Sequence, residues 1–287
     1  MITHPHVKIN LGLSVIRKRA DGYHDLETVF VPYRDISDTL EIVPADTFGE
    51  TAAPLFARYG QEQVVQDISP DGKLMITLAR TGGVDWDPLS DLTARAYGLL
   101  DADFQLPPVK IYLEKNSPVG AGLGGGSSDA AFALRMLADL FNLPLSREQL
   151  AAYAARLGSD CAFFIYEEPM LGTGRGEVLT PFPLSLEGYQ LQVLVPEGIA
   201  VSTADAYRGI VPREVRENQP VPLREALARP VSEWKDCLEN DFEETVFAKH
   251  PELAAVKQSL YDAGAVYAAM SGSGSALFAL FATSAAL

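Results

Sequence analysis

Residues 118–128, with the sequence PVGAGLGGGSS, contain five glycines within seven positions, followed by two serines and Asp129. Each glycine in a regular element costs roughly 0.5–1 kcal/mol relative to alanine, so such a run persists where the backbone needs positive φ angles or must touch a ligand closely. The helix-forming sequence after the glycines places the amides of a helix N-terminus at this loop, and such amides bind anions. We therefore predict a phosphate-binding loop, in which Ser127 and Ser128 cap the helix, bind phosphate or help to hold Mg²⁺.

Other interpretations of the glycine run fit less well. A flexible linker has polar sequence on both sides, whereas this run is flanked by apolar residues. The string GAGLGG matches a dinucleotide fingerprint at Gly120, Gly122 and Gly125, but that fingerprint directly follows a strand and its helix leads to a parallel strand. Here several residues precede the loop and two predicted helices follow it. A P-loop is excluded because no Lys-Ser or Lys-Thr pair ends the run.

The N-terminal residues alternate strictly between apolar and other side chains. Lys8 and Asn10 share one face of the predicted strand, and the opposite face carries only apolar residues (Val7, Ile9, Leu11, Leu13 and Val15). Asp21-Gly22 signals a turn, after which residues 26–31 return as a second strand. Residues 38–45 predict a third strand.

Strands cluster early in the chain, and helices follow them. A helix is expected within residues 89–103, a strand at 109–115, a buried helix after the glycines, and another that opens with a capping box from Ser146 to Gln149 and ends near Gly158. The later half predicts a strand at 189–196, a helix at 251–264, a glycine turn at 270–276 and a strand at 276–282. Residues 46–72 carry no clear pattern. The order of elements predicts an α+β fold with two lobes, divided into domains 1–165 and 166–287.

Composition restricts the class of protein. The chain has 287 residues, and its hydrophobic fraction of 47% is typical of a globular protein. Its formal net charge of −15 disfavours binding to nucleic acid. No apolar stretch reaches the roughly 20 residues of a transmembrane helix, and the N-terminus lacks a signal-peptide pattern, so we expect a cytoplasmic protein. Cys161 and Cys237 form no disulfide framework or metal-ligand spacing. Cys161 is expected to be a small buried apolar residue.

Three motifs together resemble those of the GHMP small-molecule kinases. PVGAGLGGGSSDAA is similar to their phosphate loop, VKINLGL at residues 7–13 to their first motif, and MSGSGSALFA at residues 270–279 to their last. Four further stretches (ADGYHDLETVF, RLGSDCAFFI, GRGEVLTP and LENDFEETVF) resemble the members that phosphorylate a cytidine diphosphate alcohol in the non-mevalonate route to isoprenoid precursors. The resemblance implies a two-lobed kinase fold with the active site in the cleft between the lobes, and the cofactors ATP and Mg²⁺.

The resemblance also assigns roles to individual residues. Lys8 and Asp160 match the catalytic pair, with Lys8 favouring charge on the transferred phosphoryl group and Asp160 positioning the attacking hydroxyl and taking its proton late. Tyr23, His24 and Tyr207 match substrate-binding residues, whose aromatic rings stack on cytosine while His24 hydrogen-bonds its edge. Asn10, on the strand face of Lys8, is expected to contact either the hydroxyls of the substrate alcohol or the catalytic carboxylate. The nucleotide-binding residues are Pro118, Val119, Gly120, Ala121, Gly122, Leu123, Gly124, Gly125, Gly126, Ser127 and Ser128. No metal ligand is assigned, and the protein is expected to be a monomer or homodimer.

Two alternatives remain open at this point. One is a GHMP kinase of the mevalonate or homoserine type, against which the unit DGYH at residues 21–24 argues. The other is a nucleotide-binding sensor without catalytic activity, which the retention of both Lys8 and Asp160 disfavours.

Overall fold

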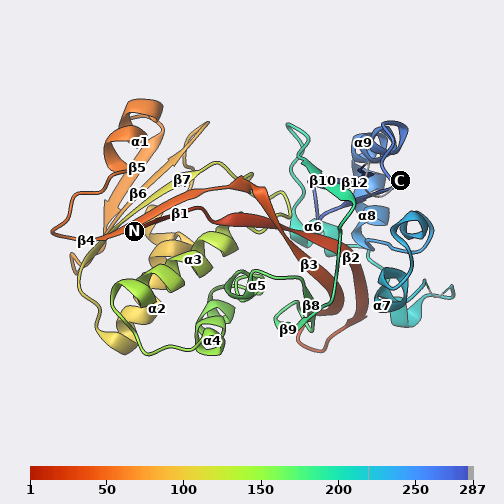
Figure 1. The fold of residues 1–287 in the computed structure, drawn as a ribbon, viewed down its shortest axis with the longest axis horizontal. Coiled ribbons are helices and arrows are strands. Elements are labelled where there is room, and N and C mark those ends of the chain that lie inside the picture. Colours follow the sequence, from red (N-terminus) through yellow and green to blue (C-terminus); the bar gives the residue numbers. More distant parts are fainter. Residues whose placement is uncertain (219, 284–287) are drawn as a thin grey trace. The chain divides into compact units, whose positions relative to one another are not determined.

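The computed structural model describes residues 1–218 and 220–283, and the chain forms two compact units (Figure 1). The first unit contains residues 1–7, 33–119 and 124–167, and the second contains residues 8–32, 120–123 and 168–287. The chain therefore passes between the units several times, including twice within the glycine loop. The domain limits 1–165 and 166–287 stay a prediction, because compact units are defined by contacts and need not follow chain order.

The first unit is built on a five-stranded sheet, and its strands lie in the order β1, β4, β7, β6, β5. Strands β6 and β7 are parallel, and the other neighbouring strands are antiparallel. The predicted strands at 38–45 and 109–115 are confirmed, whereas β5 and β6 were not expected. The bounds are Ile2–Thr3 for β1, Thr39–Pro44 for β4, Val64–Ile68 for β5, Leu74–Arg80 for β6 and Val109–Lys115 for β7.

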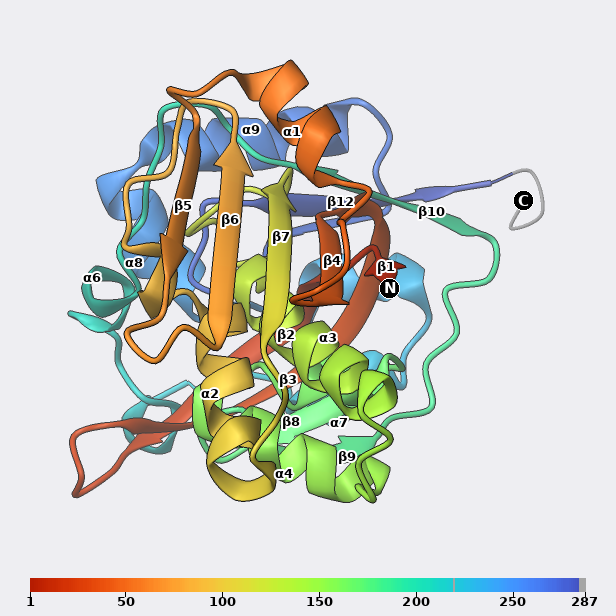
Figure 2. The ribbon, with the colours of Figure 1, turned by 90° about the vertical axis from the view of Figure 1, so that its left-hand side faces the viewer.

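Helices of the first unit pack against this sheet and against one another (Figure 2). Helix α3 contacts β4 and α2, and it is buried along most of its length, as its apolar sequence predicts. Helix α4 has the predicted capping box from Ser146 to Gln149 and ends at Gly158. The bounds are Ala52–Tyr59 for α1, Leu92–Phe104 for α2, Gly125–Leu140 for α3, Arg147–Leu157 for α4 and Phe163–Tyr166 for α5.

The second unit contains a four-stranded sheet in the order β2, β3, β8, β9. Thr28 of β3 pairs with Gly172 of β8, so strands far apart in sequence become neighbours. Both faces of β2 are buried over residues 6–15. The predicted strands at 7–15 and 26–31 are confirmed. The bounds are His6–Lys18 for β2, His24–Ser37 for β3, Met170–Thr173 for β8 and Val178–Pro181 for β9.

The second unit also contains a three-stranded antiparallel sheet in the order β10, β12, β11. The predicted glycine turn forms the tip of the β11–β12 hairpin, and the predicted helix begins at Pro251 as expected. In the part of the chain that the structure describes, no helix combines the length and apolarity needed to cross a membrane. The bounds are Tyr189–Leu194 for β10, Tyr267–Met270 for β11, Leu277–Ala282 for β12, Thr203–Tyr207 for α6, Leu223–Leu227 for α7, Phe242–Lys249 for α8 and Pro251–Asp262 for α9.

Candidate active site

Lys8 lies on β2 with only 3% of its surface exposed. Its ammonium donates hydrogen bonds to the side-chain oxygen of Asn10 and, at 3.0 Å, to the carbonyl oxygen of Gly122 in the glycine loop. The Asn10 amide in turn donates to the hydroxyl of Thr28 at 3.1 Å. The strand alternation that places Lys8 and Asn10 on one face is thus confirmed, and their polar ends are fixed in the interior of the second unit.

Residues 120–123 of the glycine loop pack against the tip of the β11–β12 hairpin. Gly120 and Gly122 have φ angles of +74° and +78°, as the phosphate-loop prediction requires. A Cβ atom on Gly122 would lie 2.3 Å from the carbonyl oxygen of Ser271, so no larger residue fits there. The Ser271 hydroxyl accepts the backbone N–H of Asn10 and donates to the carbonyl of Gly122, each at 3.2 Å. Loop, hairpin tip and β2 therefore form one polar cluster.

The remainder of the glycine loop forms the start of α3 in the first unit. Gly124 is the N-cap, with a φ angle of +73°, and no side chain caps this helix end. The prediction that Ser127 or Ser128 caps the helix is therefore wrong, since both serines lie inside its first turns. The amides of the first turn have no acceptor within a helix, so they suit an anion. Among residues 1–218 and 220–283, the buried hydroxyl of Ser128 has no hydrogen-bond partner.

Asp160 lies in the turn between α4 and α5, next to the first turn of α3. The connection is made by its neighbour Cys161, whose thiol is hydrogen-bonded to Ser127. Burial raises the pKa of the Cys161 thiol to about 12, so this cysteine is a protonated, buried residue and not a nucleophile, as expected. Within the first unit, the Asp160 turn and the N-terminal end of α3 are thus adjacent. Lys8 belongs to the second unit, and its pairing with Asp160 stays a prediction.

A buried cluster of charged side chains contacts the start of α3. The ammonium of Lys115, at the end of β7, contacts the carboxylates of Asp38 and, at 2.6 Å, Asp129, and also the Ser117 hydroxyl at 3.1 Å. Burial raises the pKa of Asp129 well above its usual range, against the opposing effect of Lys115. A Cβ on Gly125 would lie 2.3 Å from the Ser117 hydroxyl oxygen, so the cluster contacts the helix end directly.

Two of the predicted substrate-binding rings lie together in the second unit. The rings of His24 and Tyr207 stack, with centroids 4.8 Å apart and an interplanar angle of 18°. Burial, followed by the positive charge of Lys18, lowers the pKa of His24, which favours a neutral imidazole with one donor and one acceptor nitrogen. Tyr23 is 57% exposed, and the guanidinium of Arg175 lies 4.9 Å from its ring centre.

Several residues of this arrangement were not predicted. Thr28, Lys115, Arg175 and Asn240 have side chains that hold predicted residues or their backbone in place. Arg175 and Asn240 lie inside sequence stretches that indicated the family, GRGEVLTP and LENDFEETVF, so a signal for them was present. Thr28 likewise lies inside ADGYHDLETVF, whereas Lys115 lies within a predicted strand and carries no signal of its own.

Two segments of the chain match families of known proteins. Residues 91–168 match the family described as GHMP kinases N terminal domain, and residues 223–287 match GHMP kinases C terminal. A 4-diphosphocytidyl-2-C-methyl-D-erythritol kinase of Bacteroides fragilis is 48% identical over 282 residues, covering 98% of this chain and 92% of the relative. The enzyme of the same name from Porphyromonas gingivalis is 43% identical, with the same coverage of both chains.

Solved structures agree with these matches. A crystal structure of 4-(cytidine 5'-diphospho)-2C-methyl-D-erythritol kinase is 32% identical, with a TM-score of 0.73, and the match covers 98% of this chain and 90% of that chain. The mevalonate kinase of Methanococcus jannaschii has a TM-score of 0.60 at 14% identity, covering 98% and 90% of the two chains, and shows the fold alone. The predicted α+β kinase fold is confirmed, and the chain belongs to the 4-diphosphocytidyl-2-C-methyl-D-erythritol kinase family of the GHMP kinases.

Proposed function

We propose that the protein transfers the γ-phosphoryl group of ATP to the 2-hydroxyl group of 4-diphosphocytidyl-2-C-methyl-D-erythritol. The observation that carries the proposal is the burial of Lys8 on the carbonyl of Gly122, which fixes a cation beside a loop of positive-φ glycines. Relatives that are 40–48% identical over nearly the whole chain carry the name of this activity.

The glycine loop and the start of α3 are proposed to hold the ATP phosphates, through residues 118–128. The free backbone N–H groups at a helix N-terminus lie at the positive end of the helix dipole and point away from the helix. They therefore stabilise phosphate charge without a basic side chain. This fits a chain whose net charge is −15, since a local arrangement of amides must overcome the general repulsion of an anion.

Lys8 and Asp160 are the proposed catalytic residues. Lys8 stabilises the charge that spreads over the oxygens of the transferred phosphoryl group. Asp160 orients the attacking hydroxyl and accepts its proton late, because a loose transition state requires little early proton removal. The position of Asp160 beside the first turn of α3, through Cys161 and Ser127, supports this role.

The cytidine end of the substrate is assigned to Tyr23, His24 and Tyr207, and the alcohol end to Asn10. A neutral His24 can complement the donor and acceptor groups on the edge of cytosine. Because His24 and Tyr207 stack on each other, the base either joins the outer face of this pair or separates the two rings. Aromatic stacking alone does not distinguish bases, so the polar contacts select cytosine.

Mg²⁺ is proposed as the companion of ATP, and the first turns of α3 offer oxygens that fit it. The Ser128 hydroxyl and one carboxylate oxygen of Asp129 are buried, and within the described part of the chain neither has a hydrogen-bond partner. Mg²⁺ binds through one or two protein oxygens together with phosphates and waters. When bound, the ion neutralises charge on the phosphates, and Ser128 would be its protein ligand.

Two kinds of observation disfavour a mevalonate or homoserine kinase. The solved structures of such enzymes match at 13–18% identity, which supports a common fold and not a common substrate. The stacked His24 and Tyr207 also have no role for a small alcohol without a base. We further propose a cytoplasmic protein, monomeric or homodimeric, that binds no nucleic acid, and size-exclusion chromatography tests the oligomeric state.

The test is substrate-dependent release of ADP from ATP and Mg²⁺, with 4-diphosphocytidyl-2-C-methyl-D-erythritol compared with mevalonate and homoserine. Only the cytidine compound is expected to give turnover. Loss of one electrostatic stabiliser of the transition state costs roughly 10²–10³-fold in kcat, and Lys8→Ala should lose at least this much. Lys235→Ala, which changes an exposed lysine of the same unit, is the matched control and should keep the wild-type rate. Equal turnover of mevalonate, or full activity of Lys8→Ala or Asp160→Asn, contradicts the proposal.

A further inference from the structure

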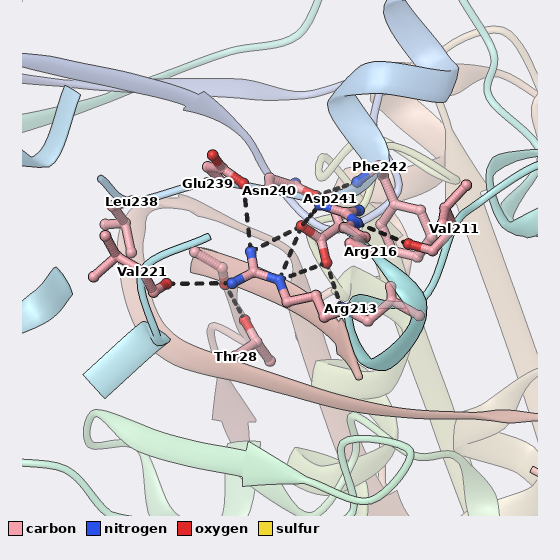
Figure 3. A network of polar contacts seen from close by, with 12 residues as sticks. Thr28, Val211, Arg213, Arg216, Val221, Leu238, Glu239, Asn240, Asp241 and Phe242 are labelled. Carbon is pink, nitrogen blue, oxygen red and sulfur yellow. Dashed lines mark hydrogen bonds and ion pairs between the residues drawn. The ribbon is translucent and has the colours of Figure 1, made fainter. Parts of the chain in front are cut away.

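Residues 239–241, near the start of LENDFEETVF, add a short segment to the edge of β2. The backbone N–H of Leu13 donates to the carbonyl of Glu239, and the N–H of Asp241 donates to the carbonyl of Leu13, both at 2.9 Å. Leu13 and Asn240 therefore form a parallel bridge. Figure 3 shows Asn240 and Asp241 at the middle of a network of polar contacts. The backbone of Asn240 is thus fixed relative to the strand that carries Lys8.

The side chain of Asn240, which is 4% exposed, uses both of its polar ends. Its amide nitrogen donates to the carbonyls of Met270 and Gly272, at 2.7 and 2.8 Å. Its oxygen accepts the backbone N–H of Phe242 at the start of α8, at 3.0 Å. One side chain therefore connects the tip of the β11–β12 hairpin to β2 and α8.

The hairpin tip held by Asn240 leads directly to Lys8. Ser271, between the two carbonyls that Asn240 binds, contacts the N–H of Asn10 and the carbonyl of Gly122 through its hydroxyl. The carbonyl of Gly122 also accepts the ammonium of Lys8. Since the Gly122 backbone packs against Ser271 without room for a Cβ, a shift of the hairpin tip displaces the acceptor of Lys8.

Asp241 fixes the opposite side of the same segment. Its carboxylate accepts the N–H of Val15 at 2.7 Å and two nitrogens of Arg213 at 2.8–2.9 Å (Figure 3). These buried, charge-assisted contacts hold residues 239–241 in register with β2. Asn240 is consequently a rigid support and not a mobile surface side chain.

We propose that Asn240 is a positioning residue for phosphoryl transfer: it holds the 270–272 hairpin tip so that Gly122 and Asn10 orient the ammonium of Lys8. The proposal rests on the proposed function, in which Lys8 acts on the transferred phosphoryl group. Asn240 itself does not touch the reacting atoms in this scheme.

The test compares Asn240→Asp with the wild-type protein. The substitution keeps the shape and the acceptor for Phe242, but it replaces the donor that faces two carbonyls with an acceptor. Misplacement of a reacting group by about 1 Å can cost 10²-fold in rate, so kcat should fall roughly 10–100-fold. KM for the cytidine substrate should change by less than about threefold, because its cytidine end is assigned to Tyr23, His24 and Tyr207 and not to the hairpin tip. Hydrogen exchange of the amides in residues 270–276 of the free protein should become faster.

Tyr267→Phe is the matched control, since it removes a buried hydrogen bond, 3.1 Å long, from the Tyr267 hydroxyl to the carbonyl of Leu238. It should lower Tm without changing kcat. If Asn240→Asp does not fold, Asn240→Ser loses the same two donors without adding charge and should show the same fall in kcat. A variant of Asn240 that lowers Tm but keeps wild-type kcat overturns the proposal. Absence of turnover in the wild-type protein would refute the proposed function instead, while exchange at 270–276 still tests the hold of Asn240 on the hairpin.

Discussion

Replacing Lys115 with methionine removes the ammonium that contacts both Asp38 and Asp129, while keeping a side chain of similar length. In the folded protein Asp38 and Asp129 have side-chain exposures of 0% and 2%, and Lys115 of 4%. Lys115→Met leaves two carboxylates in the interior without their common counter-ion. We expect this substitution to be among the most destabilising single changes in the first unit.

The magnitude follows from what each carboxylate retains. Asp38 keeps three hydrogen bonds at 2.6 Å, from the backbone N–H groups of Asn116 and Ser117 and from the Ser117 hydroxyl. Asp129 loses the ammonium, which is its hydrogen-bond partner in the described part of the chain. Breaking a buried ion pair by removing one partner costs about 3–5 kcal/mol. That is a large share of the roughly 5–15 kcal/mol by which a folded domain is stable.

The assay is urea unfolding at two pH values, with Lys73→Met as the matched control. Lys73 pairs with Asp101 at 2.5 Å but is partly exposed, so its loss should cost no more than about 1 kcal/mol. Burial raises the folded-state pKa of Asp129 above its unfolded value. Stability from this group is complete below the unfolded pKa and decreases as pH rises toward the folded pKa, so Lys115→Met should be more damaging at the higher of the two pH values.

A second substitution tests the cause of the loss. Asp129→Asn in the Lys115→Met background removes one uncompensated charge and should restore stability by roughly 1–3 kcal/mol. The reasoning is refuted if Lys115→Met costs no more than Lys73→Met, or if Asp129→Asn in that background restores nothing. Either result would mean that water or a rearranged side chain compensates the two carboxylates.

Two further predictions concern the glycine loop and the loss of stability at low pH. Gly122→Ala should lower the free energy of unfolding by more than about 1–2 kcal/mol and remove activity, because Gly122 has a positive φ and an added Cβ would lie 2.3 Å from the Ser271 carbonyl oxygen. Gly126 lies within a helix, so Gly126→Ala should not destabilise the protein. Chemical denaturation compares the two variants, and equal stability of both would contradict the geometry. The pKa of Glu167 is about 2, lowered first by its hydrogen bond with His6, so its contribution is complete above about pH 4.5 and is lost as pH falls toward 2. Thermal unfolding between about pH 2 and 5 should therefore show a shallower pH dependence for Glu167→Gln, and an unchanged slope would argue against this assignment.

Elements with local chemical signals could be predicted from the sequence. The capping box at Ser146 and the proline at 251 define helix starts through contacts within one turn, and both are confirmed. The strand at 109–115 was predicted with its bounds because β-branched and aromatic residues (Val109, Ile111 and Tyr112) stand between Pro108 and Asn116. β6 escaped prediction because a short continuous apolar run does not distinguish a buried strand from a helix. Its identity comes from parallel pairing with β7.

The parts of the candidate site that lie within one sequence motif could be predicted. The parts that depend on contacts between residues far apart in the sequence could not. Positive φ angles at Gly120, Gly122 and Gly124 follow from the glycine run itself. Capping by Ser127 was wrong because Gly124 adopts the left-handed conformation and starts the helix earlier than the serines suggest. The support that Lys115 provides depends on carboxylates far apart along the chain, and no spacing rule connects such residues before the chain is folded.

The division of the chain into units limits how this protein can be cut or assembled. A fragment that starts at residue 168 would lack β2 and β3, so β8 would lose its neighbour β3 and Asp241 would lose the N–H of Val15. The register that pairs Thr28 with Gly172 also implies that β3 must wait for residues synthesised much later before it can pair with β8. Split reporters and truncations should therefore keep residues 8–32 on the same polypeptide as the C-terminal part, for example by circular permutation.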